Sequence, residues 1–330
     1  MAGPNPLTVL PTMKGDLGRV ESQLLDSVRS DEGFLTEIAS HLISAGGKRV
    51  RPGFCIASAA TTVETEESAT PEAVTGGVSV ELVHLGSLYH DDVMDEAEVR
   101  RTVDSVNARW GNLKAILAGD FLLARASELA AGLGVEVAAL LAATIGRLCE
   151  GQLLELQHAH DLNRSEDAYL RSIDGKTAAL LAAACRIGAL VSEAPDSHVE
   201  ALTTFGRSYG MAFQLVDDVL DLVATEEQLG KPAGHDLEEG VYTLPVLHTL
   251  ASADGDELRE LLSPPLDEPA RQKALDLVRS GDGIRVTIEA ARSQASTGRE
   301  ALAQLPPSPG VTGLGAAADY LLSSVEAAAG

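Results

Sequence analysis

Two short acidic motifs contain the residues of this sequence that are best suited to chemistry. Asp91-Asp92-Val93-Met94-Asp95 and Asp217-Asp218-Val219-Leu220-Asp221 share the pattern D-D-x-x-D, and each lies in an apolar run that predicts a helix, over 78–99 and 201–223. Four helical residues turn through about 400°, so the first and last aspartates of each motif point the same way. Carboxylates at this density in an apolar wall are costly without cations. The pattern favours Mg²⁺ shared with a substrate phosphate, and the alternative is two solvated acidic helix turns.

The few basic residues gather where they could bind that phosphate. Gly46-Gly47-Lys48-Arg49-Val50-Arg51-Pro52 places three cations between a glycine pair and a helix that can begin near Pro52. Backbone N–H groups and cationic side chains of this kind suit a phosphate. Arg100-Arg101 follows the first acidic motif, and Lys176 and Lys231 add further cations. Solvated basic turns and simple charge balance are the alternatives, but together these residues are what a diphosphate site needs.

Composition indicates helices and argues against several kinds of partner. Hydrophobic residues make up 45 % of the 330 residues and aromatic residues only 3 %, which favours packed helices over a β-sandwich. The net charge of −24 argues against nucleic acid and against docking on anionic lipid. Three scattered cysteines without metal spacing predict reduced core residues of a cytoplasmic protein. We expect neither a signal peptide nor a transmembrane segment.

The expected fold is all-α, with ten or more helices in a single domain. Glycine- and proline-rich breaks separate the helical runs, for example at 46–47, 132–134 and 306–313, and no hairpin signal interrupts them. Residues 1–15 hold three prolines and predict a mobile N-terminal segment. The domain is expected to cover 16–330.

The order of these motifs resembles the trans-prenyl diphosphate synthase family, in particular its bacterial long-chain polyprenyl members. The likeness runs over about residues 40–250 through G-G-K-R-x-R-P, H-x(6)-D-D-x-x-D-x(4)-R-R, K-T, F-Q-x-x-D-D-x-x-D and G-K-x-x-G-x-D-L. It implies the isoprenoid synthase type I fold around a deep central cavity, and a homodimer. It also implies Mg²⁺-dependent head-to-tail condensation of an allylic diphosphate, farnesyl or geranylgeranyl, with isopentenyl diphosphate.

The resemblance also implies a role for each matching residue. Metal binding, with about three Mg²⁺ ions in each active site, would fall to the acidic motifs, namely Asp91 and Asp95 with Asp92 in support, and Asp217 with Asp218 and Asp221 nearby. The allylic diphosphate and its developing cation would be held by Arg100, Lys176, Lys231, Thr177 and Gln214. Isopentenyl diphosphate would be held by Lys48, Arg51, His84 and Arg101. His84 has the alternative of a satisfied core histidine.

The chemistry of the family explains these residue types. Breaking the allylic C–O bond requires neutralisation of the leaving diphosphate. The carbocation is then attacked by the double bond of isopentenyl diphosphate held alongside, and a proton is lost, we expect to the departing diphosphate. Thr102 and Asp104 depart from the family's usual Gly and Pro, which alters a loop and no ligand.

Product length depends on the helix that carries the first acidic motif. The growing tail must run from Asp91 towards the N-terminus of that helix, past Ser87, Gly86 and Val83. None is aromatic and the motif has no insertion, so we expect a tunnel for about thirty to fifty carbons. The expected fate of a product of this size is a quinone side chain, with a hopanoid or carotenoid route as the alternative. We expect its release through transient membrane contact. The alternative is a geranylgeranyl product, with a floor formed by Phe121 or Phe54.

Three other functions would account for part of this sequence. A class I terpene cyclase would lack the second acidic motif and the cluster around Lys48. A metal phosphohydrolase built on His90-Asp91 would need further histidine ligands. A catalytically silent subunit of a heteromeric prenyl synthase would generally lose the aspartates, and this sequence keeps all six.

Overall fold

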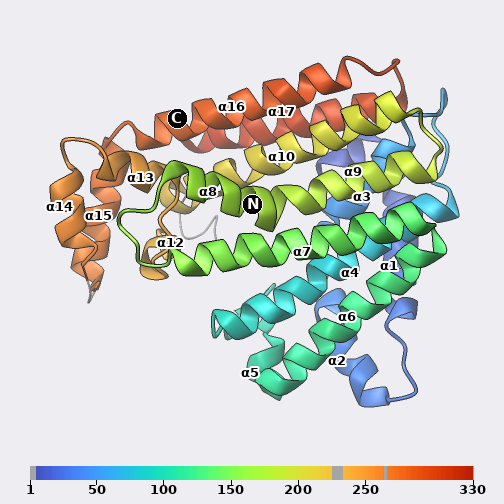
Figure 1. Ribbon diagram of the computed structural model, residues 1–330, viewed down its shortest axis with the longest axis horizontal. Coiled ribbons are helices and arrows are strands. Elements are labelled where there is room, and N and C mark those ends of the chain that lie inside the picture. The colour runs from blue at the N-terminus through green and yellow to red at the C-terminus, as the bar shows by residue number, and fades with distance from the viewer. Residues whose placement is uncertain (1–4, 225–232, 264–265, 330) are drawn as a thin grey trace.

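Helices make up most of the described chain. The computed structural model describes residues 5–224, 233–263 and 266–329. Long helices lie side by side across the molecule (Figure 1), and the described residues contain one sheet, the antiparallel hairpin of β1 (Val99–Arg100) and β2 (Val103–Asp104). The predicted all-α fold is confirmed.

The helices follow one another along the chain with mostly short connections. In order they are η1 (Pro6–Val9), α1 (Met13–Ser27), α2 (Gly33–Ser44), α3 (Val50–Ala59), α4 (Pro71–Met94), α5 (Val106–Trp110), α6 (Asn112–Gly132), α7 (Val135–Gln157), α8 (Glu166–Ile173), η2 (Asp174–Ala178), α9 (Ala179–Val191), α10 (Asp196–Val223), α12 (His235–Glu238), α13 (Leu244–Leu250), α14 (Gly255–Leu261), α15 (Glu268–Ser280), α16 (Gly283–Leu302) and α17 (Pro309–Ala329).

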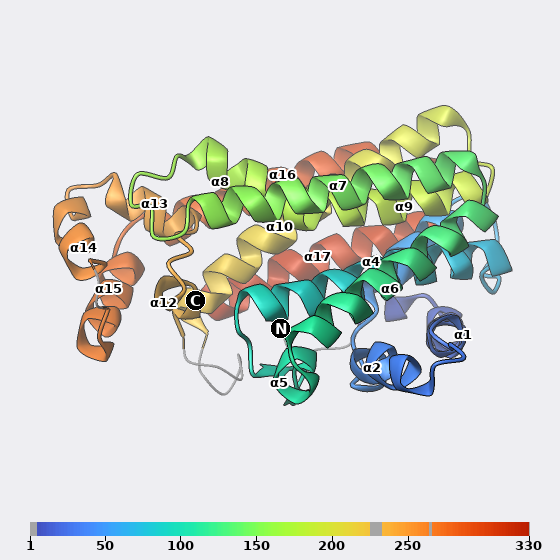
Figure 2. The same cartoon turned by 60° about the horizontal axis from the view of Figure 1, so that its bottom comes forward.

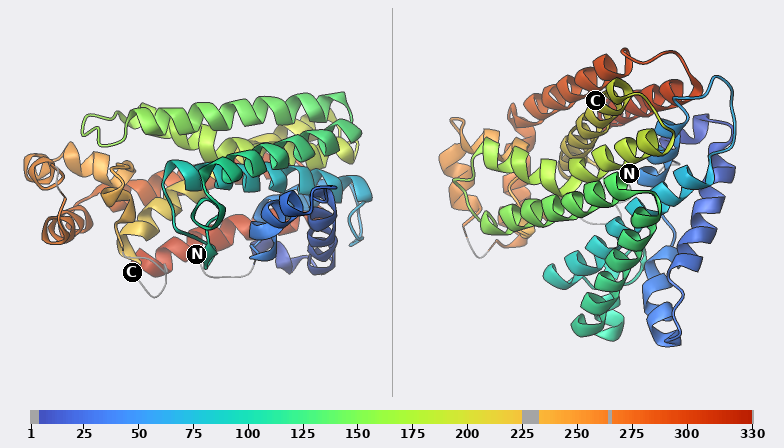
Figure 3. Two further views of the ribbon diagram at one scale, coloured as in Figure 1. Left: turned by 90° about the horizontal axis from the view of Figure 1, so that it is seen from below. Right: turned by 45° about the vertical axis from the view of Figure 1, so that its right-hand side comes forward.

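The two helices that carry the acidic motifs form the centre of the bundle. α4 packs against α3, α6 and α9, while α10 packs against α9, α16 and α17. In Figure 2 the long helices run together along the body, and α14 and α15 lie at one end. In both views of Figure 3, α14 and α15, coloured orange, lie at the end of the molecule away from the blue N-terminal helices. One connected cluster of buried side chains runs from Leu7 to Leu321.

The start of α4 follows from local sequence. Pro71 occupies its first turn, and the Thr70 side chain accepts a hydrogen bond from the Ala73 N–H. Proline in the first turn loses no helical hydrogen bond, and threonine satisfies one of the free N–H groups. The helix begins seven residues before the predicted start at Val78, because these residues form a regular N-terminus.

The N-terminal segment differs from the mobile segment predicted for residues 1–15. Leu7 and Met13 are completely buried, and the Asn5 side chain accepts a hydrogen bond from the Leu7 N–H at 2.8 Å. The apolar residues between the prolines therefore attach the segment to the body from Asn5 onward.

α7 differs from the prediction that no segment is long and apolar enough to cross a membrane. By length and composition this helix passes such a test, and only 22 % of its most apolar window is buried. It packs against η2, α8, α9 and α6, and it contributes Glu155 to the site described below. Cys149, on the same helix, is exposed, whereas Cys55 and Cys185 are buried as predicted.

Candidate active site

The first acidic motif lies at the C-terminal end of α4. The helix ends at Met94, and the N–H of its C-cap, Asp95, donates to the Asp91 carbonyl at 2.8 Å. Glu96 then takes a left-handed conformation with φ of 51°, which ends the helix before the predicted Val99. The chain turns back through the β hairpin, with Arg101 at its tip. The arginine pair is thus carried by a hairpin that the sequence did not predict.

Asp92 and Asp91 face different surroundings although they are neighbours. Successive residues of a helix differ by about 100° in direction. Asp92 is completely buried and accepts from Arg100 Nε at 2.6 Å, whereas Asp91 lines a cavity. Asp92 therefore orients Arg100.

Asp91 and Asp95 form a negative rim opposite Lys176. Burial, together with the charge of Asp95, raises the pKa of Asp91 to about 6 although Lys176 opposes the rise. Burial also raises the pKa of Asp95. Lys176 Nζ lies 2.6 Å from Glu155 Oε1. Burial lowers the pKa of Lys176, but Glu155, Asp91 and Asp95 together outweigh it, so the pKa is raised. Carboxylates with raised pKa values gain from a nearby cation.

The donor set fits a hard divalent cation only if a substrate supplies further ligands. Among the residues that the structure describes, no three His, Cys, Asp or Glu side chains form a ready metal cage. Mg²⁺ is commonly held by one or two carboxylates with substrate phosphates and water. Asp91 and Asp95 match that incomplete arrangement.

The second acidic motif occupies the last turns of α10 and its three carboxylates differ. Asp217 is exposed and Asp218 is buried. Asp221 is buried too, and its Oδ2 accepts from the Asp236 N–H at 3.3 Å. Asp217 and Asp221 thus have different exposure although they are four residues apart, because α12 covers Asp221. Lys231, the predicted ligand of the allylic diphosphate, lies outside the described residues.

A chain of hydrogen bonds fixes Asp218 and Gln214. Tyr169 donates its hydroxyl to Asp218 Oδ2, and Gln214 Nε2 donates to Asp218 Oδ1 at 2.8 Å. The Thr177 hydroxyl donates to Gln214 Oε1 at 2.8 Å. Burial raises the pKa of Asp218 to about 7, partly offset by these hydrogen bonds. Thr177 and Gln214 therefore lie together as predicted for one site, and Asp218 orients them.

Three of the predicted ligands of isopentenyl diphosphate, namely Arg51, His84 and Arg101, form a cationic cluster. Burial, and next the charge of Arg51, lower the pKa of His84 well below its usual value, with Arg101 and Arg100 adding to the effect. Burial lowers the pKa of Arg51, and its buried Nε has no hydrogen-bond partner among the described atoms. Burial also lowers the pKa of Lys48, and the charge of Asp217 opposes this. Cations that are close together and incompletely satisfied favour an anion.

An apolar cavity of about 290 Å³ extends from Asp91 between α4, α6 and α7. Its wall includes Val83, Ser87, Leu123 and Ile145, with Lys176 beside Asp91 at the polar end. Gly86 is not in the wall, contrary to prediction. A Cβ built on Gly86 would lie 3.1 Å from the Gly119 carbonyl and 3.2 Å from Leu123, so this glycine allows α6 to approach α4.

The proposed aromatic floor is not found in this cavity. Phe54 is buried in the core, where it packs against Phe205 and Tyr209. Neither Phe54 nor Phe121 lines the cavity, and its described lining holds no Phe, Tyr or Trp.

Sequence reasoning missed Glu155 and Tyr169. Glu155 is a charged residue within the apolar run of α7, and this position could have indicated a functional side chain. Tyr169 had no such signal, because its contact with Asp218 joins residues 49 positions apart.

The raised pKa of Asp91 predicts a pH-dependent cost in the metal-free protein. The pKa of Asp91 is about 6 in the folded protein and about 3.9 in the unfolded chain. The folded state therefore binds the proton more tightly, and the free energy of unfolding falls as the pH rises from about 4 through 6. Asp91→Asn should therefore raise the melting temperature in EDTA at pH 7.5 by a few degrees, about what 1 kcal/mol or more gives at this size. At pH 4 the variant and the wild type should agree. Equal melting temperatures at pH 7.5 would contradict the raised pKa.

Comparison with known proteins agrees with this geometry. The model of the Polyprenyl synthetase family matches residues 32–278. The chain belongs to the polyprenyl synthetase family. The nonaprenyl diphosphate synthase of Mycobacterium tuberculosis is 40 % identical over 314 residues, which cover 94 % of this chain and 93 % of that protein. The resemblance found in the sequence is confirmed, and the protein is a polyprenyl diphosphate synthase, a prenyltransferase.

Two solved structures extend the comparison. Polyprenyl synthase from Caulobacter crescentus, complexed with calcium and isoprenyl diphosphate, gives a TM-score of 0.88 at 34 % identity and covers 96 % of this chain and 97 % of that one. Geranylgeranyl pyrophosphate synthase from Corynebacterium glutamicum gives 0.84 at 36 % identity, with 96 % and 98 % covered. Proteins named as polyprenyl synthase and as geranylgeranyl pyrophosphate synthase thus share this fold, so the fold alone does not distinguish them.

Proposed function

We propose that this polyprenyl diphosphate synthase elongates farnesyl or geranylgeranyl diphosphate by successive trans condensation with isopentenyl diphosphate, in a Mg²⁺-dependent reaction. The observation that carries the proposal is the apolar cavity that begins at Asp91 and Lys176 and continues between α4 and α7, with Leu123 of α6 in its wall. Charged groups at one end and an apolar wall beyond them suit a prenyl diphosphate.

The described residues divide the work between two diphosphates. Asp91 and Asp95 on one side and Asp217 on the other would hold Mg²⁺, which neutralises the leaving diphosphate. Arg100, aimed by Asp92, and Lys176 would bind the same group. Arg51, His84, Lys48 and Arg101 would hold isopentenyl diphosphate, with its double bond towards the allylic carbon.

The hydrogen-bonded pair Thr177–Gln214 would stabilise the allylic cation by its oxygen dipoles. Oriented dipoles cost no reorganisation as charge develops. Burial, and then its arginine neighbours, lower the pKa of His84. A neutral His84 would donate one N–H to the substrate, and the positive charge of the cluster would come from the arginines.

A long product is supported by the wall of the cavity. Val83 and Ser87 border it, its described lining holds no Phe, Tyr or Trp, and exposed Leu153 and Leu156 line it as well. We propose a product of about thirty to fifty carbons, since a cavity of this kind can extend along the bundle. A product of this size suits a quinone side chain. We place the enzyme in the cytoplasm, with transient membrane contact when the product is released.

A homodimer is supported by the exposed apolar side chains of α6 and α7. On α6, Leu113 is 80 % exposed and Leu117 65 %, and on α7 Leu153 is 56 % exposed. Exposed apolar residues on packed helices can mark an interaction surface. A second copy of this chain would cover them.

The test of the proposed activity is incubation with farnesyl diphosphate, radiolabelled isopentenyl diphosphate and Mg²⁺, with EDTA in a parallel reaction. We expect label in the lipid extract with Mg²⁺ and none with EDTA. An unlabelled extract with Mg²⁺ present would contradict the proposal.

A further inference from the structure

We propose that Arg49 and Asn5, neither assigned to substrate, are positioning residues that hold the loop 45–49 in the geometry needed for isopentenyl diphosphate. The inference rests on the proposed function of Lys48 and Arg51. Arg49 fixes the loop through a buried ion cluster, and Asn5 fixes it through two backbone carbonyls. The N-terminal segment would thereby be part of the substrate site.

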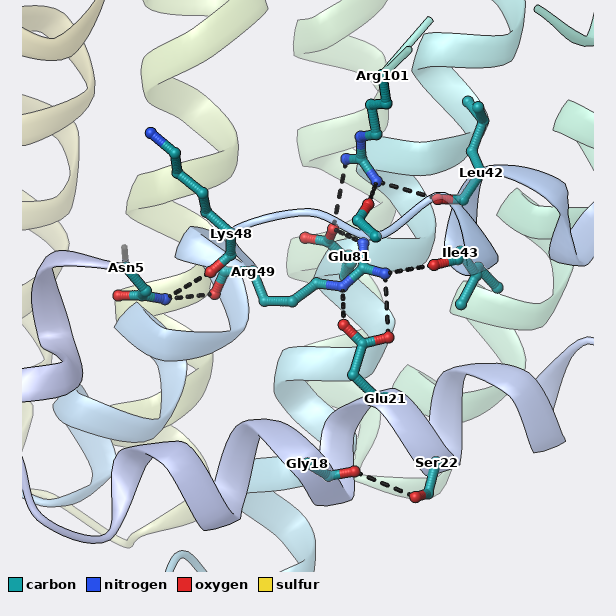
Figure 4. Close-up of polar contacts among 11 residues, drawn as sticks. Asn5, Gly18, Glu21, Ser22, Leu42, Ile43, Lys48, Arg49, Glu81 and Arg101 are labelled. Carbon is teal, nitrogen blue, oxygen red and sulfur yellow. Dashed lines mark hydrogen bonds and ion pairs between the residues drawn. The ribbon is translucent and has the colours of Figure 1, made fainter. Parts of the chain in front are cut away.

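The guanidinium of Arg49 is committed to the protein. Its Nε lies 2.5 Å from Glu21 Oε1 and its Nη1 2.9 Å from Glu81 Oε1, while Nη2 donates to Glu21 Oε2 at 3.1 Å and to the Ile43 carbonyl at 3.0 Å. Figure 4 shows this fork between the two carboxylates. The Arg49 side chain is only 2 % exposed. Arg49 is therefore unsuited to bind a diphosphate, although it lies between two residues predicted to do so.

The backbone of Arg49 is held in an unusual conformation. Its φ of 50° and ψ of 45° are left-handed, which costs an ordinary residue about 1 kcal/mol or more. This conformation sends the Arg49 side chain into the cluster, and in Figure 4 the Lys48 side chain leaves the loop on a different side. The charge of Asp217 reaches Lys48, so the opposite side of the loop faces the second acidic motif. The bonds of Arg49 offset the local strain and fix where Lys48 points.

Glu81 joins the loop to the arginine hairpin. Besides Arg49 it approaches Arg101 Nη2 at 3.9 Å, and Arg101 Nη1 donates to the Gly46 and Leu42 carbonyls. A Cβ on Gly47 would lie 2.9 Å from Arg101 Nη1 and 3.0 Å from Arg49 Nη1. Only glycine fits between the two guanidinium groups without displacing one of them. The cluster therefore sets the loop and the hairpin together.

Asn5 holds the loop from the N-terminal side. Its Nδ2 donates to the Lys48 carbonyl at 2.8 Å and to the Arg49 carbonyl at 3.0 Å, and its Oδ1 caps η1 through the Leu7 N–H. A Cβ on Gly53 would lie 3.0 Å from Asn5 Nδ2, so the segment lies close against α3. Figure 4 shows Asn5 bonded to both carbonyls.

A buried cluster of this kind is better explained by geometry than by stability. Desolvation of Arg49 and Glu81, each with a side chain 2 % exposed, consumes much of the energy that their attraction supplies. What the cluster does provide is a single orientation for the cations that follow it. Preorganised binding groups lose less free energy when the ligand arrives.

The test compares Arg49→Lys and Asn5→Asp with the wild type. Lysine keeps the charge and loses the fork, whereas aspartate keeps the cap of η1 and loses both donations to the loop. We expect each variant to raise the KM for isopentenyl diphosphate about tenfold, with the KM for farnesyl diphosphate unchanged, because displacement of binding groups by about 1 Å has effects of this order or larger. Arg49→Met should have a larger effect than Arg49→Lys.

Arg186→Lys is the matched control, since Arg186 also approaches two glutamates, Glu136 and Glu200, on helices away from the loop. It should leave both KM values unchanged. Calorimetric titration with isopentenyl diphosphate measures the same effect without turnover, so the result does not depend on the proposed condensation. A wild type that binds but does not condense would contradict the proposed function alone. Equal rises in both KM values, or a fall in melting temperature with unchanged affinity, would overturn the positioning role.

Discussion

Asp91→Ala and Asp217→Ala should each lower kcat by about a thousandfold or more while the protein stays folded. Each substitution removes a carboxylate that would hold Mg²⁺ against the leaving diphosphate, and loss of charge stabilisation in a transition state has effects of this size. Folding should survive because the pKa of Asp91 is raised to about 6 by burial and by Asp95, so removal of its charge relieves a cost. Asp217 is exposed, and its truncation leaves no cavity in the core.

The control for these variants is Asp196→Ala. Asp196 is an exposed acid in the first turn of α10, at the opposite end of the helix from Asp217, and its loss should leave kcat unchanged. The kcat should be measured at saturating Mg²⁺ and substrates, with circular dichroism as the check on folding. Unchanged turnover in either site variant would contradict the assigned metal ligands.

Ser87→Phe should shorten the product to about fifteen or twenty carbons while the diphosphate end remains active. Ser87 lies in the cavity wall one helical turn before Asp91, so a phenyl ring there would cross the path of the tail. A close-packed bundle has little room to move the ring aside. Product length should be read by chromatography after dephosphorylation. Ser87→Ala, which adds no volume, should keep the wild-type products.

Gly86→Phe distinguishes the cavity wall from the helix contact. Because a Cβ at Gly86 already approaches Gly119 and Leu123, we expect this variant to lose stability by overpacking between α4 and α6. The opposite result would be a stable Gly86→Phe enzyme with short products and a Ser87→Phe enzyme with wild-type products. That result would show that the tail does not run past Ser87.

The sequence predicted the features that depend on local pattern. Apolar periodicity around 78–99 and 201–223 is a property of single helices, and so the two central helices and the all-α class were recognised. The cations near Asp91 were recognised because their types and order are visible in the chain. The end of α4 was misplaced, since the left-handed Glu96 carries no distinctive local signal.

The parts of the site that the sequence did not reveal depend on contacts between distant residues. Tyr169 meets Asp218 only when α8 packs near α10, and Asn5 meets the loop only when the N-terminal segment folds onto α3. Gly86 was placed one position from Ser87 in the predicted wall, but neighbouring helical residues point in different directions. Which of the two faces the cavity is decided by the position of α6.

The most direct test of the central claim is the product of the purified wild-type chain, with farnesyl diphosphate, excess isopentenyl diphosphate and Mg²⁺. The products are dephosphorylated and separated by reversed-phase chromatography against polyprenol standards. The cavity below Asp91, whose described lining holds no Phe, Tyr or Trp, underlies the proposal of alcohols of about thirty to fifty carbons. A product that stops at geranylgeraniol under excess isopentenyl diphosphate would contradict the long-chain assignment.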